Sequence, residues 1–261
     1  MPLSDFTSYA DAQRYFSKQA LWELFDGNRE RLNIGHECVD RHAPERIAVR
    51  IAHGNGNVET LSFGELRVGS NQFANWLISQ GVQKGDRVAV MLEPSTAFYL
   101  SLFGTMKMGA VAVPLFTLFG SDGLRLRLND CSPKILLTTS DLAPSSDHAP
   151  HVAVHIADTA FLEKIKAQPA AFTPNTSADD MAMYQYTSGT TRELPEAVKH
   201  RHRAIVTVMI AALYATGVRP GDRYMCPSSP AWGHGLWHGT LAPMAMGCLL
   251  YTSDAADDGY R

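Results

Sequence analysis

The sequence predicts a layered α/β fold. Segments with the apolar pattern of strands alternate with segments that have the 3.6-residue periodicity of amphipathic helices along most of the 261 residues. Residues 87–92 end in an unbroken apolar run, which is typical of a strand buried on both faces. Residues 64–80 carry apolar side chains three and four positions apart, as a helix that covers a sheet does.

The first part of the chain is predicted to begin with a helical arm over residues 1–32. Residues 5–30 have apolar side chains at helical spacing, supplied by Tyr15, Phe16, Leu21, Trp22, Leu24 and Phe25. Two short strands, 47–52 and 60–63, are predicted on either side of the Gly-Asn-Gly turn at residues 54–56. The helix over 64–80 follows, with Leu66, Phe73, Ala74, Leu77 and Ile78 facing inward.

The middle of the chain is predicted to form a strand–helix–strand unit. The strand at 87–92, a helix at 95–108 and a strand at 110–115 follow one another closely, as in parallel α/β sheets. Later elements are predicted as a helix at 124–131, strands at 135–138, 181–186 and 224–226, a surface loop at 140–151, and a helix at 200–217.

Composition and charge limit the classes of function. The chain is 45% apolar and 19% charged, as soluble globular proteins are, and its formal net charge is −3. That charge, without a basic stripe interleaved with aromatics, argues against sequence-independent nucleic-acid binding. The first residues lack the pattern of a secretory leader, and no apolar run of about 18 residues could span a bilayer, so a cytoplasmic location is expected.

Cysteine and histidine spacing does not predict a metal site. The four cysteines have no CxxC spacing and are expected to be reduced and packed in the core. His234 and His238 are four residues apart, but no glutamate stands between them as in zinc-protease helices, and Gly235 weakens a helix there. We therefore expect no metal held by protein side chains alone.

The most informative motif is a hydroxyl-rich turn that follows the strand at 181–186. Thr187, Ser188, Thr190 and Thr191 bring four hydroxyls within five residues, and Gly189 allows close approach of a ligand to the backbone. The run is not the P-loop of nucleotidases, because no Gly-Lys pair follows it. Hydroxyls and turn N–H groups at the carboxyl edge of a sheet are suited to binding phosphate.

Several segments together resemble the adenylate-forming (AMP-binding) superfamily, and in particular its short- and medium-chain or aromatic acyl-CoA synthetases. The similar segments, in chain order, are 33–42 (the "N…DRH" opening), 61–66 ("LTYxEL"), 81–90 ("GVxxGDRV"), 107–115 ("GAvxvPl"), 186–191 (the phosphate-binding signature) and 230–239 (the aromatic acyl-pocket segment). The same order of motifs is more specific than any one motif, and the resemblance covers about residues 30–247.

The resemblance implies an ATP-dependent carboxylate–CoA ligase. Such an enzyme joins a carboxylic acid to AMP from Mg-ATP with release of pyrophosphate, and then transfers the acyl group to CoA. By this resemblance the cofactor-binding residues are Thr187, Ser188, Gly189, Thr190, Thr191 and Arg192, and the substrate-binding residues are Trp232, Gly233, His234 and Gly235. Plain core packing of Trp232 and Trp237 is the alternative to a role in the pocket, because large aromatic side chains usually fill cores.

The phosphate-binding segment departs from the family in two positions. Arg192 and Glu193 stand where the relatives have one Gly, and Glu196 occupies the position of their Lys. A carboxylate about 4 Å from a phosphate is unfavourable by roughly 1 kcal/mol even in water, so Glu196 cannot replace that Lys. We expect Arg192 or Lys199 to supply the charge, because an arginine can bind two phosphate oxygens at once. A weak or inactive loop is the alternative.

Residues 248–261 carry no feature of the family and resemble the translation of a sequencing-library adapter. They are therefore expected to be a non-native tail and are left out of the predicted elements. Residues 33–247 are then the incomplete N-terminal part of the family's large domain. The resemblance places the adenine-binding segment, the ribose-binding Asp, the Mg-binding Glu and the catalytic Lys beyond Gly247, so the chain is expected to be inactive alone.

Two hypotheses from other classes remain open at this stage. The first is a non-catalytic homologue that binds a nucleotide or acyl group, which Arg192 and Glu196 favour. The second is an unrelated α/β domain with an incidental Ser/Thr turn. The acyl substrate and the oligomeric state are not determined by the sequence.

Overall fold

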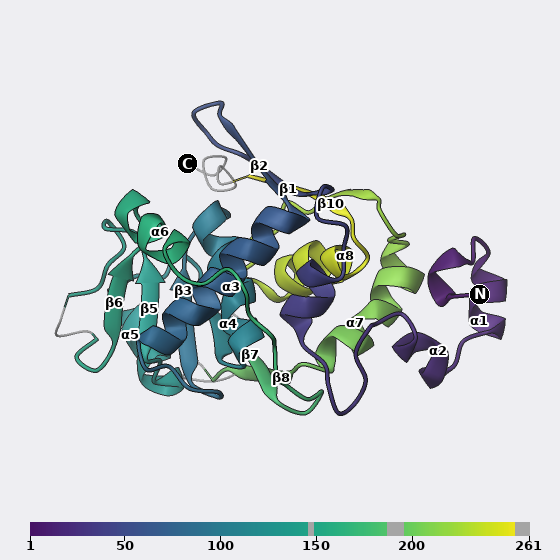
Figure 1. The fold of residues 1–261 in the computed structure, drawn as a ribbon, viewed down its shortest axis with the longest axis horizontal. Coiled ribbons are helices and arrows are strands. Elements are labelled where there is room, and N and C mark those ends of the chain that lie inside the picture. The colour runs from purple at the N-terminus through teal and green to yellow at the C-terminus, as the bar shows by residue number, and fades with distance from the viewer. Residues whose placement is uncertain (146–148, 187–195, 254–261) are drawn as a thin grey trace.

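The N-terminal arm consists of short helices rather than one long helix. The computed structural model describes residues 1–145, 149–186 and 196–253. Its first elements are η1 (Leu3–Asp5, a 3₁₀ turn), α1 (Tyr9–Arg14) and α2 (Lys18–Trp22). Within the predicted helical arm the helices are separate, because Ser8 and Ser17 each cap one of them by accepting a backbone N–H. Figure 1 shows the arm at the opposite end of the molecule from strand β6 (Ala153–Ile156).

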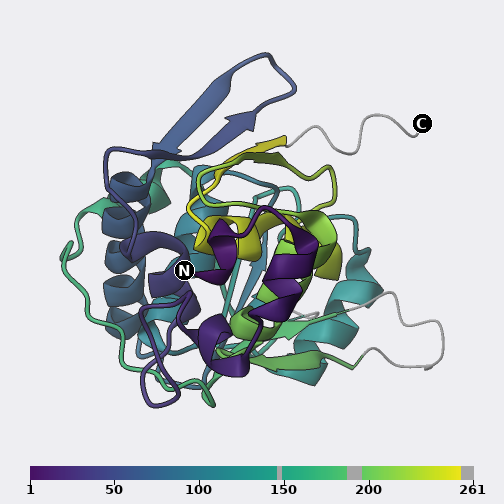
Figure 2. The same cartoon turned by 90° about the vertical axis from the view of Figure 1, so that its right-hand side faces the viewer.

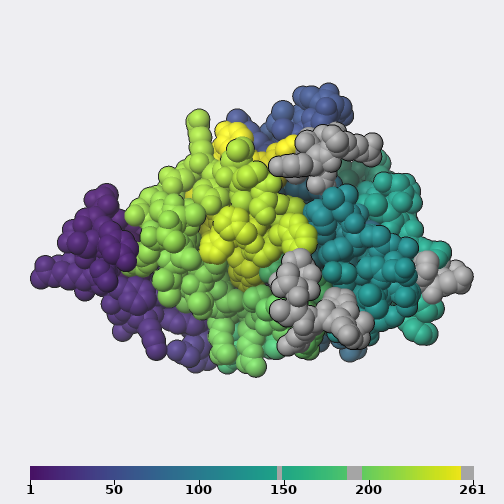
Figure 3. Space-filling view, turned by 180° about the vertical axis from the view of Figure 1, so that it is seen from behind, coloured from purple at the N-terminus to yellow at the C-terminus, as the bar shows by residue number. Residues whose placement is uncertain are grey.

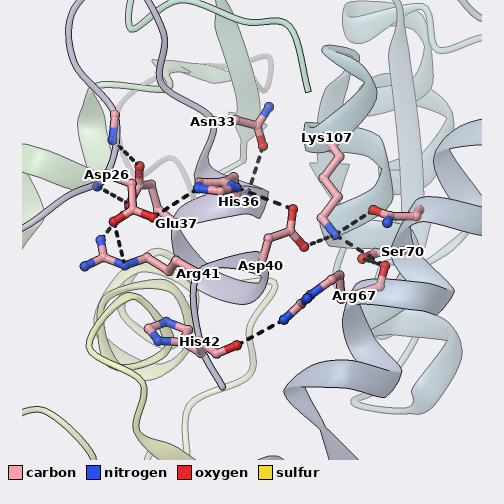
Figure 4. A network of polar contacts seen from close by, with 12 residues as sticks. Asp26, Asn33, His36, Glu37, Asp40, Arg41, His42, Arg67, Ser70 and Lys107 are labelled. Carbon is pink, nitrogen blue, oxygen red and sulfur yellow. Dashed lines mark hydrogen bonds and ion pairs between the residues drawn. The ribbon is translucent and has the colours of Figure 1, made fainter. Parts of the chain in front are cut away.

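A buried polar network joins the arm to the body of the protein (Figure 4). Glu37, in the π-helix η2 (His36–Asp40), is fully buried and accepts the backbone N–H groups of Asp26 and Gly27 at 3.1 and 2.8 Å. Arg41 pairs with the same carboxylate at 2.6 Å. These contacts compensate the cost of burying the Glu37 charge and fix the end of the arm.

The second cluster of Figure 4 is centred on Lys107, which comes from helix α4 (Thr96–Met108). Lys107 is fully buried, and its Nζ lies 2.5 Å from Asp40 Oδ1 and 2.9 Å from Asn71 Oδ1. Burial lowers the pKa of this ammonium group, and Asp40 opposes that shift. The pair therefore connects η2 to the helices that cover the larger sheet.

The larger sheet has six strands in the order β6-β5-β3-β4-β7-β8. It is parallel except for β8, which runs antiparallel to β7. Its strands besides β6 are β3 (Arg87–Met91), β4 (Val111–Pro114), β5 (Ile135–Thr138), β7 (Met181–Gln185) and β8 (Val198–Arg201). The helices of this part are α3 (Phe63–Ser79), α4, α5 (Ser121–Cys131) and α6 (Thr159–Lys166). The layered α/β prediction is confirmed.

Both faces of this sheet are buried, which explains the continuous apolar run in β3. Val88 and Val90 belong to the core that α3 and α4 cover, whereas Ala89 and Met91 pack with Leu128 of α5 on the other face. Successive side chains of a strand point to opposite faces, so a strand covered on both sides needs apolar residues at every position. The helix and strand predicted at 64–80 and 87–92 match α3 and β3 within one residue.

The smaller sheet joins a hairpin from the first quarter of the chain to the last described strand. Its order is β2-β1-β10-β9, with bounds β2 (Val58–Ser62), β1 (Ile47–Ala52), β10 (Leu249–Ser253) and β9 (Arg223–Met225). Strand β10 pairs in parallel with both β1 and β9, and Figure 2 shows the β1–β2 hairpin projecting beside it. Residues 248–261 were left out of the predicted elements, but 249–253 form strand β10; that 248–261 are a non-native tail stays a prediction.

The last helices follow β8 in the sequence, two of them before β9 and two between β9 and β10. They are α7 (Ala204–Ala211), the π-helical η3 (Ala212–Thr216) and η4 (His234–Leu241), and α8 (Ala242–Ala245). The helix predicted at 200–217 begins four residues late, because residues 198–201 pair with β7 instead. All four cysteines are free, and three of them are buried. Among the described residues, no helix has the length and apolarity needed to cross a membrane.

Candidate functional site

The candidate site begins where strands β7 and β8 form an antiparallel pair. Gln185 pairs with Val198, so the connection between the strands contains the whole hydroxyl run. Thr187, Ser188, Gly189, Thr190, Thr191 and Arg192 lie outside the described residues. The structure nevertheless describes both flanks of the connection, and these flanks are held by one carboxylate.

Asp130, near the end of α5, contacts both flanks. The Tyr186 hydroxyl donates to Asp130 Oδ2 at 2.6 Å, and the backbone N–H of Ala197 donates to the same oxygen at 3.3 Å. Burial is the largest cause of the raised pKa of the Tyr186 phenol. Asp130 therefore fixes the entry and the exit of the predicted phosphate-binding segment.

A cavity of about 850 Å³ opens beside this strand pair. It lies between β8, α7 and η4, and Figure 3 shows the segment around η4 at the molecular surface. Its lining residues are Lys199, His200, Arg201, Arg203, Ala204, Thr207, Val208, Ala211, Gly233, His234, Trp237 and His238. A partly apolar wall with polar groups at the rim is what small-molecule sites usually have.

The rim of the cavity is cationic. Lys199, Arg201 and Arg203 line it, and the two arginines share a single carboxylate, that of Asp179. Lys199 Nζ lies 5.3 Å from the centroid of the Tyr184 ring, within the range of a cation–π contact. Three cations against one carboxylate favour the approach of an anionic ligand.

Two histidines that line the cavity, His200 and His238, have a pKa below the ordinary value for an imidazole. Burial lowers the pKa of His200, and burial together with His234 lowers the pKa of His238. The His234 and His238 rings lie with their centroids 5.4 Å apart. A neutral imidazole can donate from one nitrogen and accept at the other, so these side chains can orient a polar ligand. No cluster of His, Cys, Asp or Glu suited to a metal occurs within residues 1–145, 149–186 and 196–253.

The four predicted substrate-binding residues fall into two pairs. Gly233 and His234 line the cavity. Trp232 packs instead against Phe116, with ring centroids 5.1 Å apart. Gly235 is buried where a Cβ atom would lie only 2.1 Å from the Ser229 carbonyl oxygen, so it allows two backbone segments to pack closely.

Gln185 was not recognised as a site residue in the sequence, and for Trp237 the sequence left a cavity role and core packing both open. Trp237 lines the cavity, and its Nε1 donates to Gln185 Oε1 at 3.1 Å. The signal for Gln185 was a polar residue at the end of an otherwise apolar strand, directly before the hydroxyl run. Trp237 lies in the aromatic segment, but its spacing did not distinguish it from Trp232.

Comparisons with known proteins show the family of the chain. The model of a family described as "AMP-binding enzyme" matches residues 36–260. The chain is 29% identical to the acetyl-coenzyme A synthetase of Bacillus subtilis, over 92% of this chain and 45% of that protein. It is 27% identical to a 3-hydroxybenzoate/4-hydroxybenzoate–CoA ligase of Thauera aromatica, over 89% of this chain and 47% of that protein.

A solved structure shows the same fold. The crystal structure of an acyl-CoA synthetase from Brucella canis matches with a TM-score of 0.86 at 26% identity, over 95% of this chain and 48% of that chain. The chain thus spans about half the length of the relatives it matches.

Proposed function

The chain belongs to the AMP-binding enzyme family, and we propose that it forms the nucleotide- and acyl-binding part of an ATP-dependent carboxylate–CoA ligase. The observation that carries the proposal is the β7–β8 pair, whose strands flank the hydroxyl run in the sequence and lie beside a cavity with a cationic rim. The family's phosphate-binding signature stands at that position in the sequence.

The proposed reaction has two steps. A carboxylate oxygen attacks the α-phosphorus of Mg-ATP, and the bond to the bridging oxygen of pyrophosphate breaks to give an acyl adenylate. The thiolate of CoA then attacks the acyl carbon, and AMP leaves with the electrons of the acyl–oxygen bond. Catalysis of such steps depends on positioning and charge neutralisation.

Each group of residues has a role in this proposal. Thr187, Ser188, Gly189, Thr190 and Thr191 hold the β- and γ-phosphates through hydroxyl and N–H donors. Arg192 supplies the cation that Glu196 cannot supply.

On the acyl side, Gly233 and His234 contact the carboxylic acid in the cavity. Trp232 and Gly235 hold the backbone of that segment in place. Mg²⁺ enters as part of the nucleotide substrate, CoA is the acyl acceptor, and the cytoplasm is the proposed location.

The test uses a joined protein, in which residues 1–247 are followed by the corresponding C-terminal portion of the Brucella canis acyl-CoA synthetase. Pyrophosphate release is measured with acetate, butyrate, hexanoate and benzoate. We expect release that depends on a carboxylate and on ATP, and a loss of roughly ten- to a hundredfold when Ser188 or Thr190 is changed to Ala. A folded protein that binds Mg-ATP without releasing pyrophosphate would instead indicate a non-catalytic homologue. The Brucella canis portion alone is the control.

A further inference from the structure

One aromatic side chain of the cavity is held from two strands at once. Trp237 lines the cavity and is only 7% exposed. Its indole N–H donates to Gln185 Oε1 of β7 at 3.1 Å. The ring of His200, from β8, lies against it with the centroids 4.9 Å apart and the planes at 59°. The indole therefore has a fixed orientation in the wall.

Only one of the two polar atoms of the Gln185 amide takes part in this contact. Gln185 is 3% exposed, its Oε1 accepts from Trp237, and its Nε2 has no hydrogen-bond partner among the described residues. The amide faces Gly233, where a Cβ atom would lie 3.6 to 3.9 Å from its terminal atoms. Buried polar groups normally have partners, so packing alone does not account for an amide at this position.

The other tryptophan of the segment has a different role. Trp232 is half-buried against Phe116 and is not among the residues that line the cavity. Both tryptophans belong to the same ten-residue segment, but only Trp237 is among the residues that line the cavity. The shape of the cavity wall therefore depends on Trp237.

We propose that Trp237 is the specificity-determining residue of the acyl cavity and that Gln185 is a positioning residue that holds its indole. The inference rests on the proposed function, in that the cavity binds a carboxylic acid. Flat rings pack on one another in offset or edge-to-face arrangements, which Trp237 and His200 offer, and the cationic rim attracts a carboxylate. The favoured substrate class is a planar aromatic carboxylate rather than a saturated acid of similar size.

The test uses the complete 261-residue chain labelled with ¹⁵N. Its four tryptophans give four indole N–H signals, which single Trp→Phe changes assign. Titration with benzoate is expected to shift the Trp237 signal, and cyclohexanecarboxylate is expected to bind at least about fivefold more weakly, because it cannot stack. Trp22→Phe, in α2 and not among the residues that line the cavity, is the control for Trp237→Phe and is expected to leave benzoate binding unchanged, whereas Trp237→Phe weakens it.

Two changes at Gln185 separate positioning from packing. Gln185→Leu removes the acceptor, and we expect the Trp237 indole proton to exchange about tenfold faster and benzoate to bind more weakly. Gln185→Glu keeps an acceptor for the indole, so hydrogen exchange is expected to stay near the wild-type rate.

The inference is overturned if benzoate shifts Trp232 and not Trp237, if the saturated acid binds equally well, or if Gln185→Leu changes neither exchange nor affinity. Pyrophosphate release by the joined protein tests the proposed function separately. Release with benzoate while the Trp237 signal of the chain does not respond would overturn the inference and leave the function in place.

Discussion

Gly235→Ala is predicted to destabilise the protein, because the glycine lies where two backbone segments meet. An added Cβ atom would lie 2.1 Å from the Ser229 carbonyl oxygen and 2.3 Å from that of Ser228. Reaching a separation of 3.0 Å requires 0.9 Å of movement by backbone atoms, which cannot rotate away as a side chain can. Overpacking of this kind costs about 1–3 kcal/mol, and we expect the upper part of that range.

Thermal unfolding of the 261-residue chain, followed by circular dichroism, measures the effect. A loss of about 2–3 kcal/mol corresponds to a Tm lowered by roughly 5–10 °C for a chain of this size. Gly233→Ala is the matched control two residues earlier. Its Cβ atom would meet Gln185 at 3.6 Å, an ordinary contact, and its φ and ψ of −53° and −46° suit alanine.

The control is expected to be neutral or to stabilise the chain by up to about 1 kcal/mol through the unfolded state. A Gly235→Ala chain that melts within about 1 °C of wild type would refute the reasoning, since the Ser228–Ser229 backbone would then move at no cost. Equal losses in both variants would also refute it, because they would show that any side chain in this segment is unfavourable.

Three further predictions address the loop, the buried ion pair and the effect of pH. In the joined protein, Arg192→Ala is expected to slow adenylation by about ten- to a hundredfold, and Glu196→Lys to be neutral or mildly favourable; an indifferent Arg192→Ala beside a large gain from Glu196→Lys would show a degraded loop. Lys107→Met leaves Asp40 without its buried cation and should lower the free energy of unfolding, measured in urea, by about 3–5 kcal/mol. Adding Asp40→Asn to Lys107→Met should restore part of that stability. A loss below about 1 kcal/mol would contradict the importance of the buried pair. Burial lowers the pKa of His202 from 6.5 to about 3, so between these pH values the unfolded chain binds a proton that the folded chain does not. The free energy of unfolding should therefore fall as the pH drops from 6.5 towards about 4, and His202→Gln should make that fall smaller. An equally steep pH profile in the variant would exclude His202 as the cause.

Local signals in the sequence determined the elements that depend on neighbouring residues. Helix α3 begins at Phe63 because Ser62 and Glu65 form a capping box, and α4 ends at Gly109 because that residue adopts a left-handed conformation with φ of 82°. Strand β3 is recognisable because it is buried on both faces and is therefore apolar along its length. Patterns of this kind need only a few consecutive residues, so the layered α/β class followed from them.

Pairing with strands from distant parts of the chain determined the elements whose local sequence favours a different secondary structure, or favours no secondary structure at all. The sequence predicts that a helix begins at His200, but residues 198–201 form a strand because β7 supplies hydrogen-bond partners. Strand β10 exists because Val49 of β1, two hundred positions earlier, pairs with Leu250. Propensity is a weak guide where such long-range hydrogen bonds are available.

In the candidate site, too, one part follows from the local sequence and another part is decided only by tertiary contacts. The hydroxyl run is consecutive in the sequence, and its residue types indicate phosphate binding without any knowledge of the fold. The choice between Trp232 and Trp237 as the cavity wall depends on which indole reaches Gln185, 52 positions away from Trp237 in the chain. Sequence spacing within one segment does not contain that information, because the partner comes from a strand of the larger sheet that only the folded chain brings into contact.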